Sequence, residues 1–252
     1  MSTLLTDTAL IFGRYARQTL RSRLQMLFGL LMPLLYLLFF GPLLTDLPLG
    51  PAGTSSWQVL VPGLLLQLAL FGGGFCGFGI LMEKQSGVVE RMRVTPVSRL
   101  ALLLGRVLRD AAVLVLQSVL LVLAAVAMGL RAPLPGVLIG LAFVAVLTLA
   151  LSSLSHALAL KVRTPQEFAP VINAVTMPSM LLSGLMLPMT LGPGWLDVLS
   201  HVMPFRHLVD AVREAFTGDY ASAALLRGAL VALALTVVSV TLCTRAFKKS
   251  AA

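Results

Sequence analysis

The sequence predicts an all-α integral membrane protein with six membrane-spanning helices. Of its 252 residues, 58% are hydrophobic and 12% are charged, and the mean hydropathy is +0.95. A water-soluble globule of this composition could not cover its surface with polar side chains, whereas a protein embedded in lipid has no such need. The apolar runs are continuous and rich in Leu and Ala. They therefore predict helices and not the alternating strands of a membrane barrel.

Six apolar runs are long enough to cross a hydrocarbon core, which takes about 20 helical residues. They extend from Met26 to Leu44, Trp57 to Met82, Ala111 to Leu130, Leu134 to Leu160, Phe168 to Met189 and Ala221 to Thr244. The first run lacks a small-x-small cleavage pattern, so we expect it to be retained as a span. Because the connections are short, we expect one transmembrane domain, residues 26–252.

The N-terminal segment, residues 1–25, is expected to form an amphipathic helix. Its basic side chains Arg14, Arg17 and Arg21 recur at helical spacing, and Leu4, Ile11 and Tyr15 fall on another face. A helix of this kind typically lies in the membrane interface, with its apolar face toward the lipid. Contact with a soluble partner is a possible addition.

The basic residues predict the orientation of the chain. On the assignment above, 15 of the 19 Lys and Arg residues fall in the N-terminal segment, the loops after the second and fourth spans, and the tail. Cytoplasmic loops carry such an excess, so both termini are expected in the cytoplasm. The net charge of +9 is then a basic rim against anionic lipid and does not require nucleic acid.

We find no candidate catalytic, metal or nucleotide site. Cys76 and Cys243 lie within apolar spans, and the three histidines lack ligand spacing; these are His156, His201 and His207. The glycine cluster at 72–74 lacks the Lys-Ser/Thr of a phosphate-binding loop and predicts close helix packing. We therefore expect neither an enzyme nor a cofactor-binding chain.

An ion-coupled secondary transporter is the main alternative. Such carriers place an ionisable group near the bilayer midplane, and the middle of every predicted span lacks Asp and Glu. The one candidate is Asp110, which begins the third span and is expected to pair with Arg106 one helical turn earlier. A membrane enzyme, the third possibility, would need a convergent polar site.

A charged segment from Glu83 to Arg99 separates two apolar spans. Within it, Val88, Val89 and Met92 would share one side of a short helix, and Pro96 would end that helix. A short amphipathic helix of this kind can fill a cleft on a soluble partner. The alternative is a helix that lies against lipid headgroups.

The segment from Leu191 to Gly218 has helical periodicity but carries too many charges for a span. Pro204 separates two apolar stripes, and Arg206 lies one turn before Asp210, so their charges can pair. Irregular structure at membrane depth is tolerated where it packs on protein. We expect two short re-entrant helices that cap the outer side; helices on the outer surface are the alternative.

Two motifs resemble those of the ABC-2 type permeases, the membrane subunits of bacterial ABC exporters. The first is Glu83-Lys84-x-x-Gly87-x-x-Glu90-Arg91, followed by Val94-Thr95-Pro96-Val97-Ser98-Arg99. The second is Leu182-Ser183-Gly184-Leu185-Met186-Leu187-Pro188, with Gly194-Trp195-Leu196, Pro204-Phe205 and Val209-Asp210-Ala211-Val212-Arg213. Drug-resistance and nodulation-type permeases are closest in size. Val88 and Met203 depart from the pattern, where Thr and Asn are common.

The resemblance implies a homodimer in the bacterial cytoplasmic (inner) membrane, bound to two separate ATPase subunits that bind ATP and Mg. Export of a small-molecule, lipid or glycolipid substrate would follow a path at the dimer interface. The residues implied in coupling to the ATPase are Glu83, Lys84, Gly87, Val88, Val89, Glu90, Arg91, Met92, Arg93, Thr95 and Pro96. Those of the re-entrant segment are Pro188, Trp195, Pro204, Phe205, Asp210 and Arg213.

Overall fold

The computed structural model describes residues 2–21, 23–44, 55–86, 99–162, 164–185, 189 and 192–249. Every long regular element within these ranges is an α-helix, so the predicted all-α class is confirmed. The helices are α1 (Ser2–Arg21), α2 (Arg23–Leu43), α3 (Ser56–Phe75), α4 (Gly77–Gln85), α6 (Arg99–Ala127), α7 (Leu134–Lys161), α8 (Pro165–Leu182), α9 (Gly194–Ser200), α10 (Pro204–Thr217) and α11 (Ala223–Lys249).

Five helical stretches of the described chain are long and apolar enough to cross a membrane. They are Met26–Leu43, Ser56–Gln85, Ala101–Ala127, Leu134–Lys161 and Ala223–Ala246, and each overlaps a predicted span. The remaining prediction, Phe168 to Met189, falls on α8, which contains Pro170 and Pro178 and ends at Leu182. Because α8 is not one of the five stretches, the sixth span stays a prediction.

The helix that corresponds to the third predicted span begins much earlier than Ala111. Helix α6 starts at Arg99, so Arg106 and Arg109 lie inside it. Both arginines have acidic partners, Glu83 for Arg106 and Asp110 for Arg109. Because these charges are paired on the protein, the helix can continue through them into the bundle.

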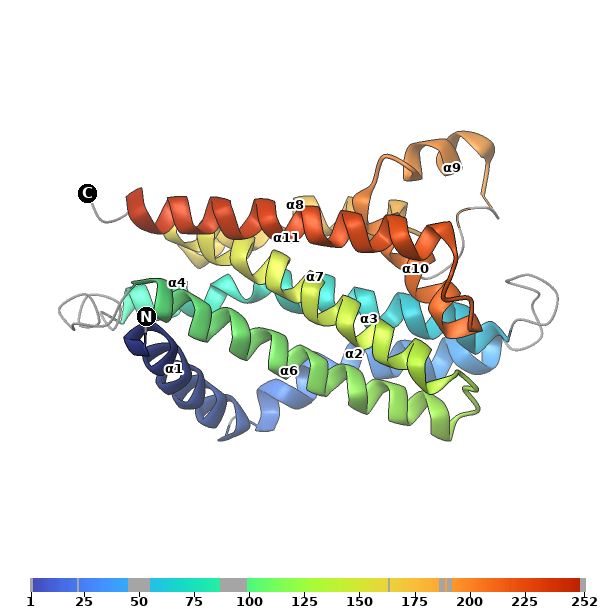
Figure 1. Cartoon of the computed structure of the whole chain (residues 1–252), viewed down its shortest axis with the longest axis horizontal. Coiled ribbons are helices and arrows are strands. Elements are labelled where there is room, and N and C mark those ends of the chain that lie inside the picture. The colour runs from blue at the N-terminus through green and yellow to red at the C-terminus, as the bar shows by residue number, and fades with distance from the viewer. Residues whose placement is uncertain are drawn as a thin grey trace.

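Helix α7 lies at the centre of the bundle and packs against α3, α6, α10 and α11 (Figure 1). Two of its glycines allow α10 to approach closely. A Cβ atom on Gly136 would lie 2.0 Å from the carbonyl oxygen of Ala215, and one on Gly140 would lie 2.8 Å from the Phe216 ring. Small residues at a spacing of four are the usual means of close helix contact in lipid.

The second predicted span, Trp57 to Met82, is divided into two helices. Helix α3 ends at Phe75 and α4 begins at Gly77, on either side of Cys76. Ser155 on α7 bridges the break, because its Oγ accepts a hydrogen bond from the Gly77 amide at 2.8 Å and donates one to the Gly74 carbonyl. One serine thus satisfies backbone groups that the interruption would leave unpaired in lipid.

Different helices lie at the two ends of the bundle. In Figure 1, α1, the end of α4 and the end of α11 lie at the left, whereas α9 and α10 lie at the right. At the right-hand end, Gln58 donates hydrogen bonds to the carbonyls of Arg131 at 2.8 Å and Phe216 at 3.3 Å. This side chain ties the start of α3 to the α6–α7 turn and to the end of α10.

We predict that Gly136→Ala lowers the thermal unfolding midpoint of the purified protein. The added methyl group would meet the Ala215 carbonyl, a backbone atom that cannot rotate away, and such overpacking typically costs about 1–3 kcal/mol. The matched control is Gly79→Ala, since a Cβ at Gly79 has no neighbour within 4 Å. Equal midpoints for the two variants would contradict the close contact of α7 and α10.

Candidate functional site

The predicted coupling residues lie partly within the described chain. Glu83 and Lys84 occupy the end of α4, where Lys84 is exposed and Glu83 is half-buried. The other nine, Gly87, Val88, Val89, Glu90, Arg91, Met92, Arg93, Thr95 and Pro96, lie outside the described residues. The charged segment from Glu83 to Arg99 is called the charged loop below. The candidate site is its base, the end of α4 together with the helices that contact it.

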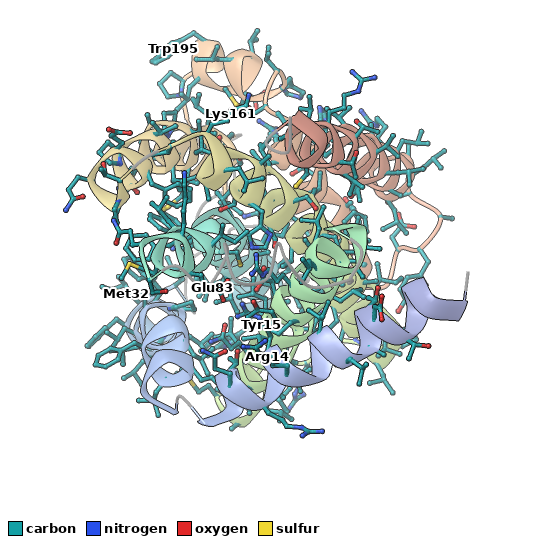
Figure 2. The ribbon with its side chains drawn as sticks, turned by 90° about the vertical axis from the view of Figure 1, so that its left-hand side faces the viewer. Arg14, Tyr15, Met32, Glu83, Lys161 and Trp195 are labelled. Atoms are coloured by element: carbon teal, nitrogen blue, oxygen red, sulfur yellow. The ribbon has the colours of Figure 1, made fainter. Side chains whose placement is uncertain are left out.

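Three helices meet at this base through Arg106, Glu83 and Tyr15. The guanidinium group of Arg106 on α6 forms an ion pair with Glu83 on α4. The same group donates hydrogen bonds from Nε and Nη2 to the Tyr15 hydroxyl of α1, at 3.1 and 2.7 Å. Tyr15 in turn donates to Glu83 Oε2 at 3.3 Å. Figure 2 shows Glu83 and Tyr15 side by side among these helices.

Burial shapes the electrostatics of this cluster. Arg106 is 5% exposed and Tyr15 is 6% exposed. Burial raises the pKa of Tyr15 above its ordinary value of 10.0, although the Arg106 cation acts in the opposite direction. The hydroxyl therefore stays protonated at neutral pH and can donate to Glu83. Arg106 also lies over the Tyr15 ring, 5.1 Å from its centroid, which adds a cation–π attraction.

The contacts of α1 differ from those predicted for Tyr15, which was assigned to a lipid-facing stripe. Instead Tyr15 faces the protein, as do Thr8 and Thr19, and all three are buried. Gly105 on α6 makes this packing possible, since a Cβ there would lie 2.6 Å from the Ile11 side chain. The outer face keeps Leu10, Arg14 and Arg17 exposed, so α1 still presents an amphipathic surface.

A second polar cluster lies deeper in the bundle, around Asp110. The predicted pair of Asp110 with Arg106 is wrong, because Arg106 is engaged by Glu83. Asp110 instead accepts a hydrogen bond from Ser152 at 2.6 Å and lies 3.3 Å from Arg109 and 3.4 Å from His156. It is 2% exposed. Asp110 is thus a buried carboxylate inside a candidate span, not a residue at its edge.

The return segment contains two helices, α9 and α10, at the end of the bundle opposite α4. Their re-entrant arrangement in the membrane stays a prediction. Pro204 is the first residue of α10, where a missing amide hydrogen costs nothing, and Phe205 is buried. The predicted pair of Arg206 with Asp210 is confirmed at 3.3 Å, and Arg206 also binds Asp197 at 2.5 Å. Trp195 on α9 is 68% exposed. Pro188 lies outside the described residues.

Arg213 of α10 anchors the return segment to the bundle. Its guanidinium group donates to the carbonyls of Val59 at 3.2 Å and Gly184 at 2.7 Å. Burial lowers its pKa to about 10, and Asp210 acts in the opposite direction, so the group stays charged at neutral pH. Arg213 therefore has a structural role in this arrangement, joining α10 to α3 and to the end of α8.

Sequence analysis missed Arg106 and Tyr15 as partners of Glu83, and Ser152 and His156 as partners of Asp110. One signal was present: Arg106 stands in an otherwise apolar stretch from Leu100 to Leu108, and a lone cation in such a stretch needs a counter-charge. Nothing in the spacing identifies that partner as Glu83, because the two residues belong to different helices.

We predict that Glu83→Gln increases hydrogen exchange of the backbone amides of α1. Loss of the carboxylate leaves Arg106 buried without a counter-charge, which costs about 3 kcal/mol, whereas Tyr15→Phe removes hydrogen bonds worth about 1 kcal/mol. Hydrogen exchange of the α1 amides should therefore rise strongly in the first variant and modestly in the second. Tyr220→Phe, at an exposed tyrosine, is the control. Unchanged protection of the α1 amides in Glu83→Gln would contradict a role of the Arg106–Glu83–Tyr15 cluster in holding α1.

A family model described as ABC-2 type transporter matches residues 6–217. Relatives named as candidate transport permeases, ycf38, occur in Cyanophora paradoxa, 24% identical with 79% of this chain and 70% of the relative aligned, and in Pyropia yezoensis, 24% identical with 85% and 75% aligned. These names indicate a transport permease and not an enzyme. The chain belongs to the ABC-2 type transporter family.

Proposed function

We propose that this chain is the permease subunit of an ATP-driven exporter, which acts as a homodimer with two separate ATPase subunits. The proposed substrate path lies at the interface of the two copies. In this proposal the charged loop after α4 binds the ATPase, and both termini face the cytoplasm of a bacterial cell.

The observation that carries the proposal is the cluster of Arg106, Glu83 and Tyr15 at the base of the charged loop. Glu83 is held by two helices at once, α6 through Arg106 and α1 through Tyr15. A loop on such a base transmits a displacement to the bundle, because movement of α4 must either carry α1 and α6 with it or break a buried ion pair. This is the property required of a segment that converts ATPase movement into helix movement.

The N-terminal segment fits the same proposal. Helix α1 lies outside the parallel helices and at an angle to them (Figure 1), with Arg14 and Arg17 exposed beside Leu10. An amphipathic helix at the basic end of the bundle is suited to the interface of the cytoplasmic leaflet. We infer that α1 rests on this leaflet and braces the loop from the side.

An ion-coupled transporter is the second candidate function, and one observation favours it. Asp110 is buried within a candidate span and contacts His156, so an ionisable group does lie inside the bundle. Such groups often mark ion or proton sites in carriers. The contacts to Arg109 and Ser152 give Asp110 a structural explanation, which is why the exporter remains our proposal.

The proposed orientation predicts which sites a membrane-impermeant maleimide can reach. In a variant with Cys76→Ala and Cys243→Ala, Gln85→Cys should react only from the cytoplasmic side and Tyr220→Cys only from the outside. Both native side chains are exposed at opposite ends of the bundle. Measurement on intact cells and on inverted vesicles separates the two sides. Reaction of Gln85→Cys from outside would refute the orientation and the coupling role together.

The proposed coupling predicts that Glu90→Lys weakens assembly with the partner ATPase about ten- to a hundredfold, the effect of losing one charge-assisted contact worth about 1.5–3 kcal/mol. The measurement is co-purification with the partner ATPase, followed by export from vesicles. Glu167→Lys makes the same charge change outside the loop and is the control. Export by the lone chain on a proton gradient would instead support the ion-coupled transporter.

A further inference from the structure

A groove of about 310 Å³ opens between α7, α8 and α11, and Gly74 of α3 also lines it. Its walls are largely apolar. Four of the large side chains in these walls are between 42% and 57% exposed, namely Leu154, Val171, Val175 and Leu242. The groove therefore opens toward the surroundings of the bundle and requires an apolar neighbour there.

The hydroxyl groups that line the groove already have partners within the protein. Ser155 donates to the Gly74 carbonyl, and Thr176 Oγ1 donates to the Ile172 carbonyl at 2.9 Å. Neither hydroxyl needs a hydrogen-bond acceptor from outside. The inner part of the groove is therefore suited to a hydrocarbon chain, which offers no polar group.

The mouth of the groove is positively charged. Lys161 ends α7, is exposed, and is the one charged side chain among the described lining residues. Figure 2, which looks onto this end of the bundle, shows Lys161. Within the described chain no ion pair joins Lys161 to an acidic residue, Glu167 of α8 included. Arg245 precedes the lining residue Ala246 on α11 and is also exposed, so it adds a second cation at this end.

The depth of the groove matches one leaflet of a membrane. Helix α7 lines it from Leu151 to Lys161, and at 1.5 Å per residue this stretch is about 15 Å long. The hydrocarbon core of a bilayer is about 30 Å thick, so one leaflet takes up about half of that. A lysine at the end of a spanning helix extends its ammonium group to the level of the headgroups. The cation thus lies where the phosphate of a lipid would be, and the apolar walls lie where its acyl chain would be.

We propose that this groove binds an anionic phospholipid of the leaflet at this end of the bundle, with an acyl chain between α7, α8 and α11 and the phosphate beside Lys161. Basic residues at the membrane surface attract lipids with net negative charge. A second copy of the chain is the other possible occupant. It would bring the same basic helix ends to the mouth, so charge complementarity favours the lipid. Neither the ATPase nor the direction of transport enters this binding.

The test uses the chain alone in detergent, titrated with phosphatidylglycerol or with phosphatidylcholine of the same acyl chains, and native mass spectrometry counts the bound lipids. The first phosphatidylglycerol should bind about fivefold more tightly, equivalent to about 1 kcal/mol for one lysine near a headgroup. Lys161→Gln should remove this preference and leave the affinity for phosphatidylcholine unchanged. Lys84→Gln is the matched control, because it removes an exposed lysine of α4 that does not line the groove.

A second pair of variants tests the acyl-chain part of the groove. Leu154→Trp fills it and should weaken the binding of both lipids about tenfold, equivalent to about 1.4 kcal/mol. Leu138→Trp, at an exposed position on the same helix, should not. Equal affinity of the native chain for the two lipids, a preference retained in Lys161→Gln, or unchanged binding in Leu154→Trp would each overturn the proposal. A smaller dimer fraction in Leu154→Trp with unchanged lipid binding would assign the groove to a second copy instead. ATP-driven export by the assembled complex, alongside any of these results, would leave the proposed function intact.

Discussion

The pairing of Arg106 with Glu83 is the interaction on which the loop-bearing end of the molecule depends. A guanidinium group that is 5% exposed within a candidate span would cost several kcal/mol without a counter-charge. The pair allows α6 to carry Arg106 into the bundle and fixes the end of α4. Tyr15 binds both members of the pair and so holds α1 against the other two helices. Three elements distant in the sequence thus meet at one ion pair. Separation of α4 from α6 would leave Arg106 without its counter-charge, whereas departure of α1 would remove only the hydrogen bonds of Tyr15.

Apolar length and proline placement made much of the fold predictable. Continuous apolar runs located five spans, and Pro204 between two apolar stripes located α9 and α10. The start of α6 was not predictable by the same reasoning, because Arg106 and Arg109 look like loop residues until their partners are known. The break at Cys76 was equally hidden, since its stability depends on Ser155 from another helix.

In the candidate site too, contacts within one helix were predictable and contacts between helices were not. Local pairs such as Arg206 with Asp210 follow from helical spacing and were predicted correctly. Glu83 lies 23 residues from Arg106 and 68 from Tyr15, and Asp110 lies 42 residues from Ser152. One sequence carries no record of which helices become neighbours.

The interruption between α3 and α4 has a mechanical consequence. A continuous helix of this length would behave as a stiff rod and carry a push from one membrane face to the other. Here the nine residues of α4 form a short lever whose fulcrum is the Ser155 bridge to α7. Force applied at Gln85 would therefore act on α7 as torque through this bridge, in addition to acting on α1 and α6 through Glu83.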